Sequence, residues 1–243
     1  VAESAPLTVS GNAFLITEAV KDGLRTHARY QMHVRAGRNS AQLEMTCANV
    51  ASLQVFVDGK PVYAENVQDV YRIPLSTSQM PMEIDVFVAT RPMQHEDTYS
   101  VPVLTLRNAD STQLNCFVLT PANRMPESSD GVLETQPESI AAVTRMAIGG
   151  SRHAAKGDFF RANQQFASQW QFHAAQSDIA CVVASQPADG VLRMRLYDMR
   201  FDASKKLITI FVVCLMFLVL LHMSAAGWWL AGIGLLILAL IHH

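Results

Sequence analysis

The sequence contains none of the short motifs that identify the commonest enzyme sites. The phosphate-binding loop G-x-x-x-x-G-K-[ST], the dinucleotide fingerprint G-x-G-x-x-G, the hydrolase elbow G-x-S-x-G and the zinc motif H-E-x-x-H are all absent. The acids Glu83, Asp85 and Asp97 are scattered, without the pairing that acid–base catalysis uses. The sequence therefore predicts no catalytic residue, no metal site and no cofactor, and it favours a non-enzymatic protein.

Charged residues are also scarce, at 16% of the chain against about 25% in an average soluble domain. The deficit lies at the C-terminal end, where no Asp, Glu, Lys or Arg follows Lys206. The net charge of -2 excludes the strongly basic surface of nucleic-acid-binding proteins. No nucleic-acid partner is therefore expected.

Cysteine is rare, and its spacing excludes the common zinc sites. The residues Cys47, Cys116, Cys181 and Cys214 are far apart and form no C-x-x-C pair. Cys214 lies in an apolar run, where it acts as a small hydrophobic residue. Cys47 and Cys116 each lie on a predicted strand, and whether they form a disulfide stays open.

A long apolar run occupies the C-terminal end. As one helix, the 35 residues Leu207–Ile241 would rise roughly 52 Å, beyond the ~30 Å hydrocarbon core of a bilayer. A break at Ser224–Gly227 would divide the run into Leu207–Met223 and Gly227–Ile241. We therefore expect a two-helix transmembrane hairpin over residues 205–243. A buried hairpin in a soluble core and a hairpin that enters the membrane without crossing it are the alternatives.

Three residue pairs are expected to hold this hairpin in place. Lysines before the first helix can reach lipid headgroups, tryptophans after the break suit an interfacial belt, and glycines in the second helix allow close helix–helix contact. These pairs are, in order, Lys205 and Lys206, Trp228 and Trp229, and Gly232 and Gly234. His222, the ionisable residue within the run, is expected at the interface.

The region before the run is rich in β-strand patterns. Period-two alternation predicts strands at Leu24–Arg35 and Leu43–Cys47. Asp58-Gly59 between apolar runs predicts a hairpin that joins Leu53–Val57 to Pro61–Tyr63. Further short strands are expected at Tyr71–Leu75, Met82–Val88, Val101–Leu106 and Cys116–Leu119. Strands separated by regular turns predict a mainly β fold, an antiparallel β-sandwich over residues 1–121.

The chain changes character after the predicted sandwich. Residues 122–138 carry prolines, serines and acids and are expected to form a linker. Residues 139–204 form a small α/β segment that connects the sandwich to the hairpin. Its elements are expected to be helices at Ser139–Met146 and Asp158–Ala175 and strands at Ile179–Val183 and Val191–Phe201.

Three other features allow a functional and a structural interpretation, and the structural one is favoured for each. The polar face of the Leu24–Arg35 strand is either a patch for an acidic partner or a solvated surface. Gly149–His153 is either an anion-binding nest or a glycine pair that ends a helix. The aromatic residues of Phe159–Phe172 either line a groove or pack a helix on a sheet. The polar face of the strand consists of Arg25, His27, Arg29, Gln31, His33 and Arg35.

The run Leu53–Val62, with Val-Asp-Gly-Lys-Pro-Val at its end, and the run Asn115–Pro121 resemble strands of bacterial cell-surface β-sandwich modules. With the C-terminal hairpin, they make the chain similar to uncharacterised envelope proteins of planctomycete-type bacteria. The resemblance covers residues 12–121 and the hairpin, and it implies an envelope location and no catalytic residues.

The leading hypothesis is a membrane-anchored, non-enzymatic envelope protein whose sandwich mediates protein–protein interaction or scaffolding. Its expected partners are membrane lipid and another protein, or further modules of a longer chain. The soluble part is expected outside the cytoplasm, with the cytoplasmic side as the alternative. An accessory subunit of a membrane transport or enzyme complex and a membrane-tethered hydrolase with a site on loops are the alternative functions.

Overall fold

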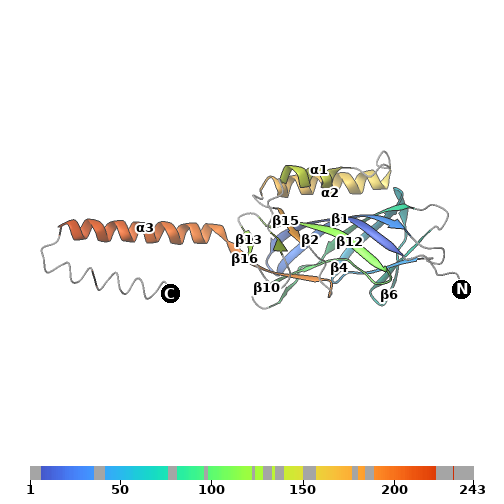
Figure 1. Cartoon of the computed structure of the whole chain (residues 1–243), viewed down its shortest axis with the longest axis horizontal. Helices are drawn as coiled ribbons and strands as arrows, with labels where there is room; N and C mark the ends of the chain where they lie inside the picture. The colour runs from blue at the N-terminus through green and yellow to red at the C-terminus, as the bar shows by residue number, and fades with distance from the viewer. Residues whose placement is uncertain are drawn as a thin grey trace. The chain divides into compact units, whose positions relative to one another are not determined.

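A computed structural model of the chain divides it into two compact units, residues 1–197 and residues 198–243. The structure describes residues 7–35, 42–75, 81–95, 98–121, 124–127, 133–134, 140–149, 157–176, 180–183, 189–222 and 232. Among these described residues, the first unit contains two helices and three sheets, and the second contains the helix α3 (Met199–His222) (Figure 1). Each unit is described by itself below.

An eight-stranded sheet, sheet A, is the centre of the first unit. Its middle is a long hairpin of two 13-residue strands, β1 (Thr8–Val20) and β2 (Gly23–Arg35). Strand β1 also pairs in parallel with β12 (Ser111–Leu119), so the sheet is mixed. The strand order is β14 (Leu133–Glu134), β15 (Ala180–Val183), β12, β1, β2, β8 (Met82–Thr90), β4 (Val50–Val57) and β5 (Lys60–Val62).

Two four-stranded sheets lie against one face of sheet A. Sheet B has the order β11 (Thr105–Leu106), β3 (Gln42–Thr46), β7 (Val70–Pro74), β6 (Glu65–Val67). Sheet C has the order β13 (Arg124–Glu127), β16 (Val191–Asp198), β10 (Thr98–Pro102), β9 (Gln94–His95). One apolar core joins the three sheets, with Tyr30 and Met32 from sheet A, Met45 and Ile73 from sheet B, and Met194 from sheet C.

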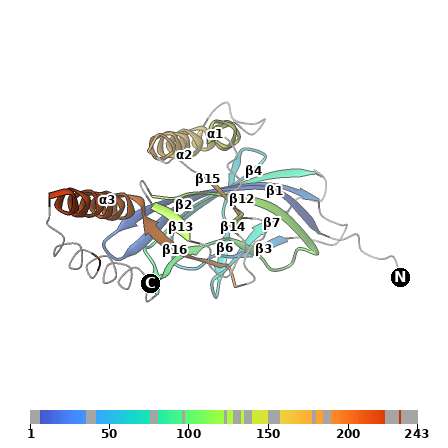
Figure 2. The same ribbon diagram turned by 60° about the vertical axis from the view of Figure 1, so that its left-hand side comes forward.

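Two helices, side by side in one layer, cover the opposite face of sheet A (Figures 1 and 2). They are α1 (Ile140–Ile148) and α2 (Asp158–Ala174). Phe14 of β1 stacks on Phe117 of β12 and meets Trp170 of α2 edge to face. The Trp170 indole N–H donates to Thr144 Oγ1 of α1 at 3.1 Å, which ties the two helices together.

A buried ion pair fastens this helical layer to sheet A. Arg29 of β2 donates from Nε and Nη2 to Asp85 Oδ1 of β8, at 3.2 and 3.0 Å. Its Nη1 donates to the carbonyl oxygen of Ala147 in the last turn of α1 at 2.9 Å. Its guanidinium also lies over the Phe87 ring. A cation at this end of a helix satisfies a carbonyl that has no partner inside the helix.

Several of the predicted strands are confirmed, but the predicted Val191–Phe201 strand ends at Asp198, where α3 follows, and the antiparallel sandwich is wrong. The structure confirms the Leu24–Arg35 strand as β2, and the Asp58-Gly59 hairpin has both turn residues at positive φ. The parallel β1–β12 pair makes sheet A mixed, and sequence periodicity carries no information on strand order. Strand β1 was not expected, because its core segment Ala13–Thr17 is buried on both faces and does not alternate.

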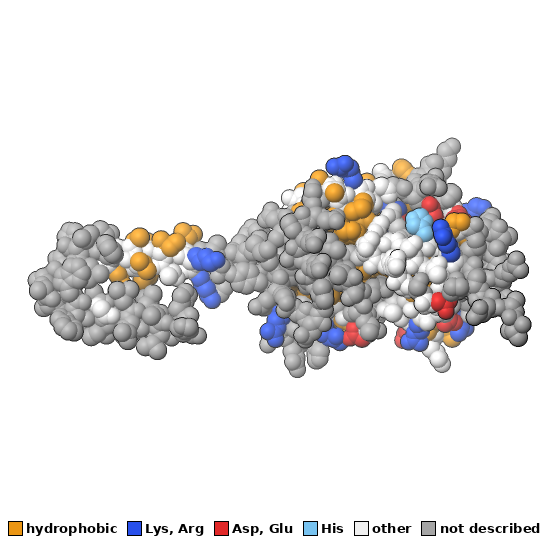
Figure 3. Space-filling view, in the orientation of Figure 1, with side chains coloured by type: hydrophobic (Ala, Val, Ile, Leu, Met, Phe, Trp, Pro, Cys, Tyr) orange, Lys and Arg blue, Asp and Glu red, His pale blue; other side chains and the backbone are white. Residues whose placement is uncertain are grey.

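The second unit contains the helix α3 (Met199–His222), which carries no Asp, Glu, Lys or Arg after Lys206. Most of its described apolar side chains are exposed, from 42% at Val213 to 67% at Leu207, while Val212 and Met216 are half-buried. They are drawn in orange along α3 in Figure 3, after the two lysines in blue.

The predicted C-terminal two-helix transmembrane hairpin is contradicted. Within the described residues, no helix is both long enough and apolar enough to span a bilayer. Helix α3 begins at Met199, so its first turns include Arg200, Asp202 and the two lysines. Its charge-free part, Leu207–His222, is 16 residues long and rises roughly 24 Å, short of the ~30 Å hydrocarbon core. The expected break at 224–227 lies outside the described residues.

Replacing Asp85 by Ala should destabilise the first unit strongly. The change leaves the Arg29 guanidinium buried without its counter-charge, and loss of one partner of a buried pair costs about 3–5 kcal/mol. Urea unfolding measures the change in the free energy of unfolding. The double variant Arg29→Met with Asp85→Leu should recover much of the loss, because no buried charge remains.

The pair Arg72–Glu44, whose side chains are partly exposed to solvent, serves as the control. Arg72→Gln should cost less than about 1 kcal/mol, since ion pairs that water can reach contribute little. Equal losses for Asp85→Ala and Arg72→Gln would contradict the structural role given to the buried pair.

Candidate functional site

A cavity of about 600 Å³ opens in the first unit where strands of all three sheets end. Its size is that of a pocket for a small organic ligand. We name it the Arg91–Arg107 cavity. Its walls are Thr46, Cys47, Ala48, Asn49, Val50, Asn66, Asp69, Tyr71, Arg91, Val103, Thr105, Arg107, Asp189 and Gly190.

The two arginines come from short segments whose backbones are held by hydrogen bonds. Arg91 directly follows β8, and its backbone N–H donates to the Asn49 carbonyl oxygen at 2.8 Å. Arg107 directly follows β11, and its backbone N–H donates to the Glu44 carbonyl oxygen at 3.0 Å. Both side chains are exposed. Neither guanidinium has an ion-pair or hydrogen-bond partner in the part of the chain that the structure describes.

The acidic side chains on the walls do not neutralise the positive charge of these two arginines. Asp189 is engaged, because Arg193 Nη1 donates to its Oδ2 at 2.6 Å and the Val191 N–H donates to its Oδ1 at 3.2 Å. The hydrogen bond from Arg193 is the main reason that the pKa of Asp189 is lowered. Asp69 lies on the β6–β7 turn, at φ 64°. Two guanidinium groups therefore face one available carboxylate, which favours an anionic ligand.

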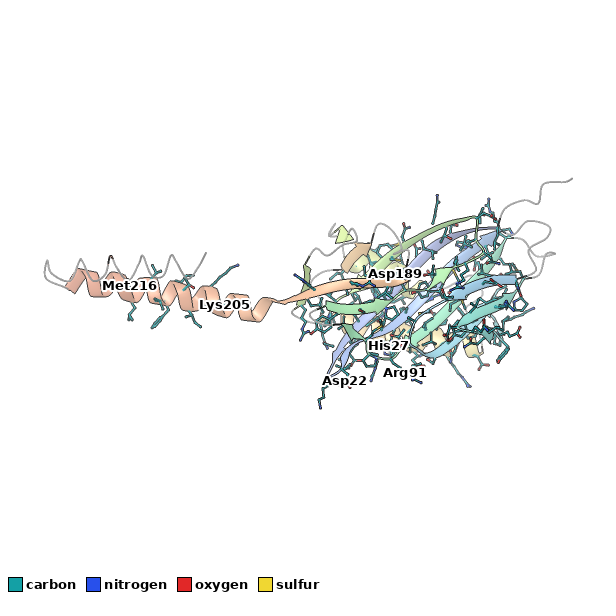
Figure 4. All side chains as sticks on the ribbon, turned by 90° about the horizontal axis from the view of Figure 1, so that it is seen from below. Asp22, His27, Arg91, Asp189, Lys205 and Met216 are labelled. Atoms are coloured by element: carbon teal, nitrogen blue, oxygen red, sulfur yellow. The ribbon has the colours of Figure 1, made fainter. Side chains whose placement is uncertain are left out.

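Neutral hydrogen-bonding groups complete the walls. Asn66 Oδ1 accepts from the Asp69 N–H at 3.2 Å, which leaves its amide N–H₂ for a ligand. Burial raises the pKa of Tyr71, so its hydroxyl stays a neutral donor. Gly190 lets the segment before β16 pass close to Thr105 of β11, because a Cβ at this position would lie 2.7 Å from Thr105 Oγ1. Arg91 and Asp189 are labelled in Figure 4.

The thiol in this cavity is unsuited to nucleophilic chemistry. Cys47 is 8% exposed, and burial raises its pKa to about 12. Burial likewise raises the pKa of Cys116 to about 12. A thiol with so high a pKa holds almost no thiolate at neutral pH. Cys47 and Cys116 are also separate free thiols, which answers the question of a disulfide between them. In the described residues no group of three or more His, Cys, Asp or Glu could hold a metal ion.

The residues singled out for membrane attachment are not among the residues that line this cavity. Lys205 and Lys206 are exposed on α3. Gly232 is helical, and a Cβ built on it meets no atom within 4 Å among the described residues. Trp228, Trp229 and Gly234 lie outside the described residues, so helix–helix contact at the glycines stays a prediction. The expected membrane-anchored envelope function, its membrane-bound alternatives and the membrane location all depended on the hairpin, and the absence of a spanning helix in the described chain contradicts them.

The sequence favoured a fully solvated polar face for β2, but only part of this face is exposed to solvent. Arg25, His33 and Arg35 are exposed, whereas Arg29 is fully buried beneath the helices. A strand pattern cannot show that helices from later in the chain cover this face. The aromatic prediction holds for Phe159, Phe166 and Trp170, which pack against sheet A, while Phe160 and Phe172 are exposed. Residues 150–156 lie outside the described residues, so the Gly149–His153 nest is untested.

The arginines of the cavity carried no signal in the sequence. Arg91 and Arg107 lie 16 positions apart in separate loops, and neither belongs to a motif. Isolated arginines on loops are common and usually solvated. Only the pairing of β3 with β11 and of β4 with β8 brings their backbones to the same cavity.

Comparisons with known proteins identify no family for this chain. No model of a protein family matches the sequence, and no curated protein matches it. Solved structures show distant likeness: an M1 zinc metallopeptidase from Deinococcus radiodurans has 13% identity and a TM-score of 0.39, over 55% of this chain and 36% of that one. Legionella pneumophila aminopeptidase A has 12% identity and a TM-score of 0.35, over 54% of this chain and 18% of that one.

Yeast LTA4 hydrolase has 9% identity and a TM-score of 0.34, over 50% of this chain and 25% of that one. The chain therefore spans less than two fifths of the length of each neighbour. TM-scores this low support no functional inference.

His27, next to the helical layer, should make the stability of the first unit depend on pH. Burial lowers its pKa below the ordinary value of 6.5, with Arg25 and His173 acting in the same direction and Glu18 opposing them. The unfolded chain then binds a proton more readily than the folded chain. Stability should fall as pH drops through about 6.5, and the loss is complete below the folded-state pKa.

The variant His27→Gln should remove this part of the pH dependence. Urea unfolding of both proteins between pH 8 and pH 5 measures it, and His33→Gln, on the exposed end of the same strand face, is the matched control. If His27→Gln and the parent chain lose stability in parallel, the lowered pKa of His27 is refuted.

Proposed function

We propose that this chain is a ligand-binding protein whose Arg91–Arg107 cavity binds an organic anion. The observation that supports the proposal is two guanidinium groups on the walls of one cavity of ligand size, neither of which has a partner among the described residues. Guanidinium groups bind carboxylate or phosphate through paired hydrogen bonds, so two of them together define both the charge and the orientation of a ligand.

A binding role fits the walls better than catalysis does. The walls combine cations, hydroxyls and side-chain amides, which orient a bound molecule. The Cys47 thiol is held protonated by burial, and Asp189 is held ionised by Arg193. Neither is tuned toward neutral pH, as a general base or nucleophile would be.

Replacing either arginine should weaken anion binding without unfolding the chain. Isothermal titration of the full chain with citrate and with phosphate measures the affinity. Arg91→Gln and Arg107→Gln should each weaken binding at least about tenfold, as expected for a lost charge-assisted hydrogen bond. Because both side chains are exposed, thermal unfolding should change little.

Arg195→Gln makes the same change of charge at an exposed strand position outside the cavity walls and is the matched control. It should leave citrate binding unchanged. Binding that survives both cavity substitutions, or that Arg195→Gln weakens equally, would show that the anion does not occupy this cavity.

A further inference from the structure

A second cavity, of about 610 Å³, adjoins the Arg91–Arg107 cavity. We name it the Tyr63 cavity. Asn66 and Tyr71 line both cavities, so the two share a wall formed by the β6–β7 hairpin. The other walls of the Tyr63 cavity are Leu53, Gln54, Val55, Phe56, Pro61, Val62, Tyr63, Ala64, Asp158, Arg161, Ala162 and Gln165.

The Tyr63 cavity passes round the open edge of sheet A. Val55 belongs to the core between the sheets, whereas Phe56 faces the helices, where it meets Phe159 of α2 edge to face. A cavity lined by both faces of β4 and by α2 must therefore extend past β5, the last strand of the sheet. Together the two cavities define a trough that runs from the arginines, past the β6–β7 hairpin, to the first turns of α2.

Strand β5 is poorly suited to hold a ligand by strand pairing. The Asp58-Gly59 turn closes on the pair Val57–Lys60, which is the hydrogen-bonded pair of a two-residue hairpin. The next pair, Phe56–Pro61, then directs its backbone groups away from the hairpin, toward the open edge. Pro61 has no N–H to offer there. Recognition along this trough must depend on side chains.

The side chains of the Tyr63 cavity match the parts of a peptide. Tyr63 is 86% exposed and offers an aromatic surface for apolar side chains. Gln54, Gln165 and Asn66 carry amide groups, which donate and accept as a peptide group does. Arg161 and Asp158 at the far end have no ion-pair partner among the described residues, so they can meet ligand charges of either sign.

We infer that the two cavities form one binding site for an extended peptide with a free C-terminal carboxylate. Arg91 and Arg107 bind the carboxylate, Tyr71 and Asn66 contact the last residues, and Tyr63 packs against the residues before them. The inference rests on the proposed function, because it identifies the anion in the Arg91–Arg107 cavity as the end of a peptide chain.

Charge complementarity favours a peptide over an acidic oligosaccharide. A chain of uronic sugars repeats its negative charge along its length, and Asp69 and Asp158 would each oppose part of that charge, even where Arg161 attracts it. A peptide with its negative charge at one end places that charge beside the arginines only. The apolar side chains of a peptide also suit the accessible surfaces of Val62 and Tyr63.

Two libraries of random seven-residue peptides test the inference, one with free C-terminal carboxyls and one with C-terminal amides. The full chain selects binders from each, and fluorescence anisotropy measures their affinity. Binders should come from the free-carboxyl library, and amidation of a selected peptide should weaken it at least about tenfold. Arg91→Gln should weaken the free acid by a similar factor and its amide much less, since both changes remove the same contact.

Tyr63→Ala should weaken selected peptides while leaving citrate binding unchanged, whereas Phe172→Ala, an exposed aromatic of α2 outside both cavities, should weaken neither. Citrate binding without any selected peptide, equal affinity for acid and amide, or tight binding of an oligogalacturonate alone would each overturn the inference and leave the proposed function standing. Citrate binding that is insensitive to Arg91→Gln and Arg107→Gln would overturn both.

Discussion

The buried ion pair of Arg29 and Asp85 is the contact on which the helical side of this protein depends. Each charge costs several kcal/mol to remove from water, and only complete hydrogen bonding offsets that cost. Arg29 achieves it by donating to Asp85 and to the Ala147 carbonyl oxygen at once. The Arg29 side chain thus links the neighbouring strands β2 and β8 and also holds the C-terminal end of α1. Through the hydrogen bond of Trp170 to Thr144, the position of α1 also constrains α2, whose first turns supply Arg161 to the trough.

On the side of sheet A that faces sheets B and C, apolar contacts hold the sheets together, but one region of sheet B stays exposed to solvent. Tyr30 crosses the core, and its hydroxyl oxygen accepts from the Leu104 N–H at 2.9 Å, next to the loop that carries Arg107. Met45 and Ile73 of sheet B are fully buried against sheet A, but Tyr71 is partly exposed and Asn66 is exposed. The inner face of sheet B is therefore uncovered at its β6 edge. The two cavities lie there, so the site exists because one sheet extends beyond the cover of its neighbour.

Much of the local structure was predictable, because it depends on neighbours in sequence. The alternation from Leu24 to Arg35 placed Thr26 and the five apolar residues of the same face of β2 on the buried side, and the Asp58-Gly59 pair specified its hairpin. The helices at Ile140–Ile148 and Asp158–Ala174 followed from helix-stop and helix-start residues. Strand β1 was not predicted, because a strand buried on both faces shows no alternation of apolar and polar residues. The transmembrane hairpin was inferred from the charge-free composition of a run, and composition does not set where α3 begins or how long it is.

By itself, the sequence determined the strands with one buried and one solvent-exposed face, two of the helices, the tight hairpin turn and the absence of familiar enzyme motifs. These features depend on side-chain period, on turn residues and on local spacing, which a linear pattern contains. The tertiary structure alone decided that β1 pairs with β12 in parallel, that Arg29 is buried, and that Arg91 and Arg107 share a cavity. Each of these depends on which distant segments meet, and contact between distant segments is governed by the packing of whole sheets and helices rather than by any residue's neighbours along the chain.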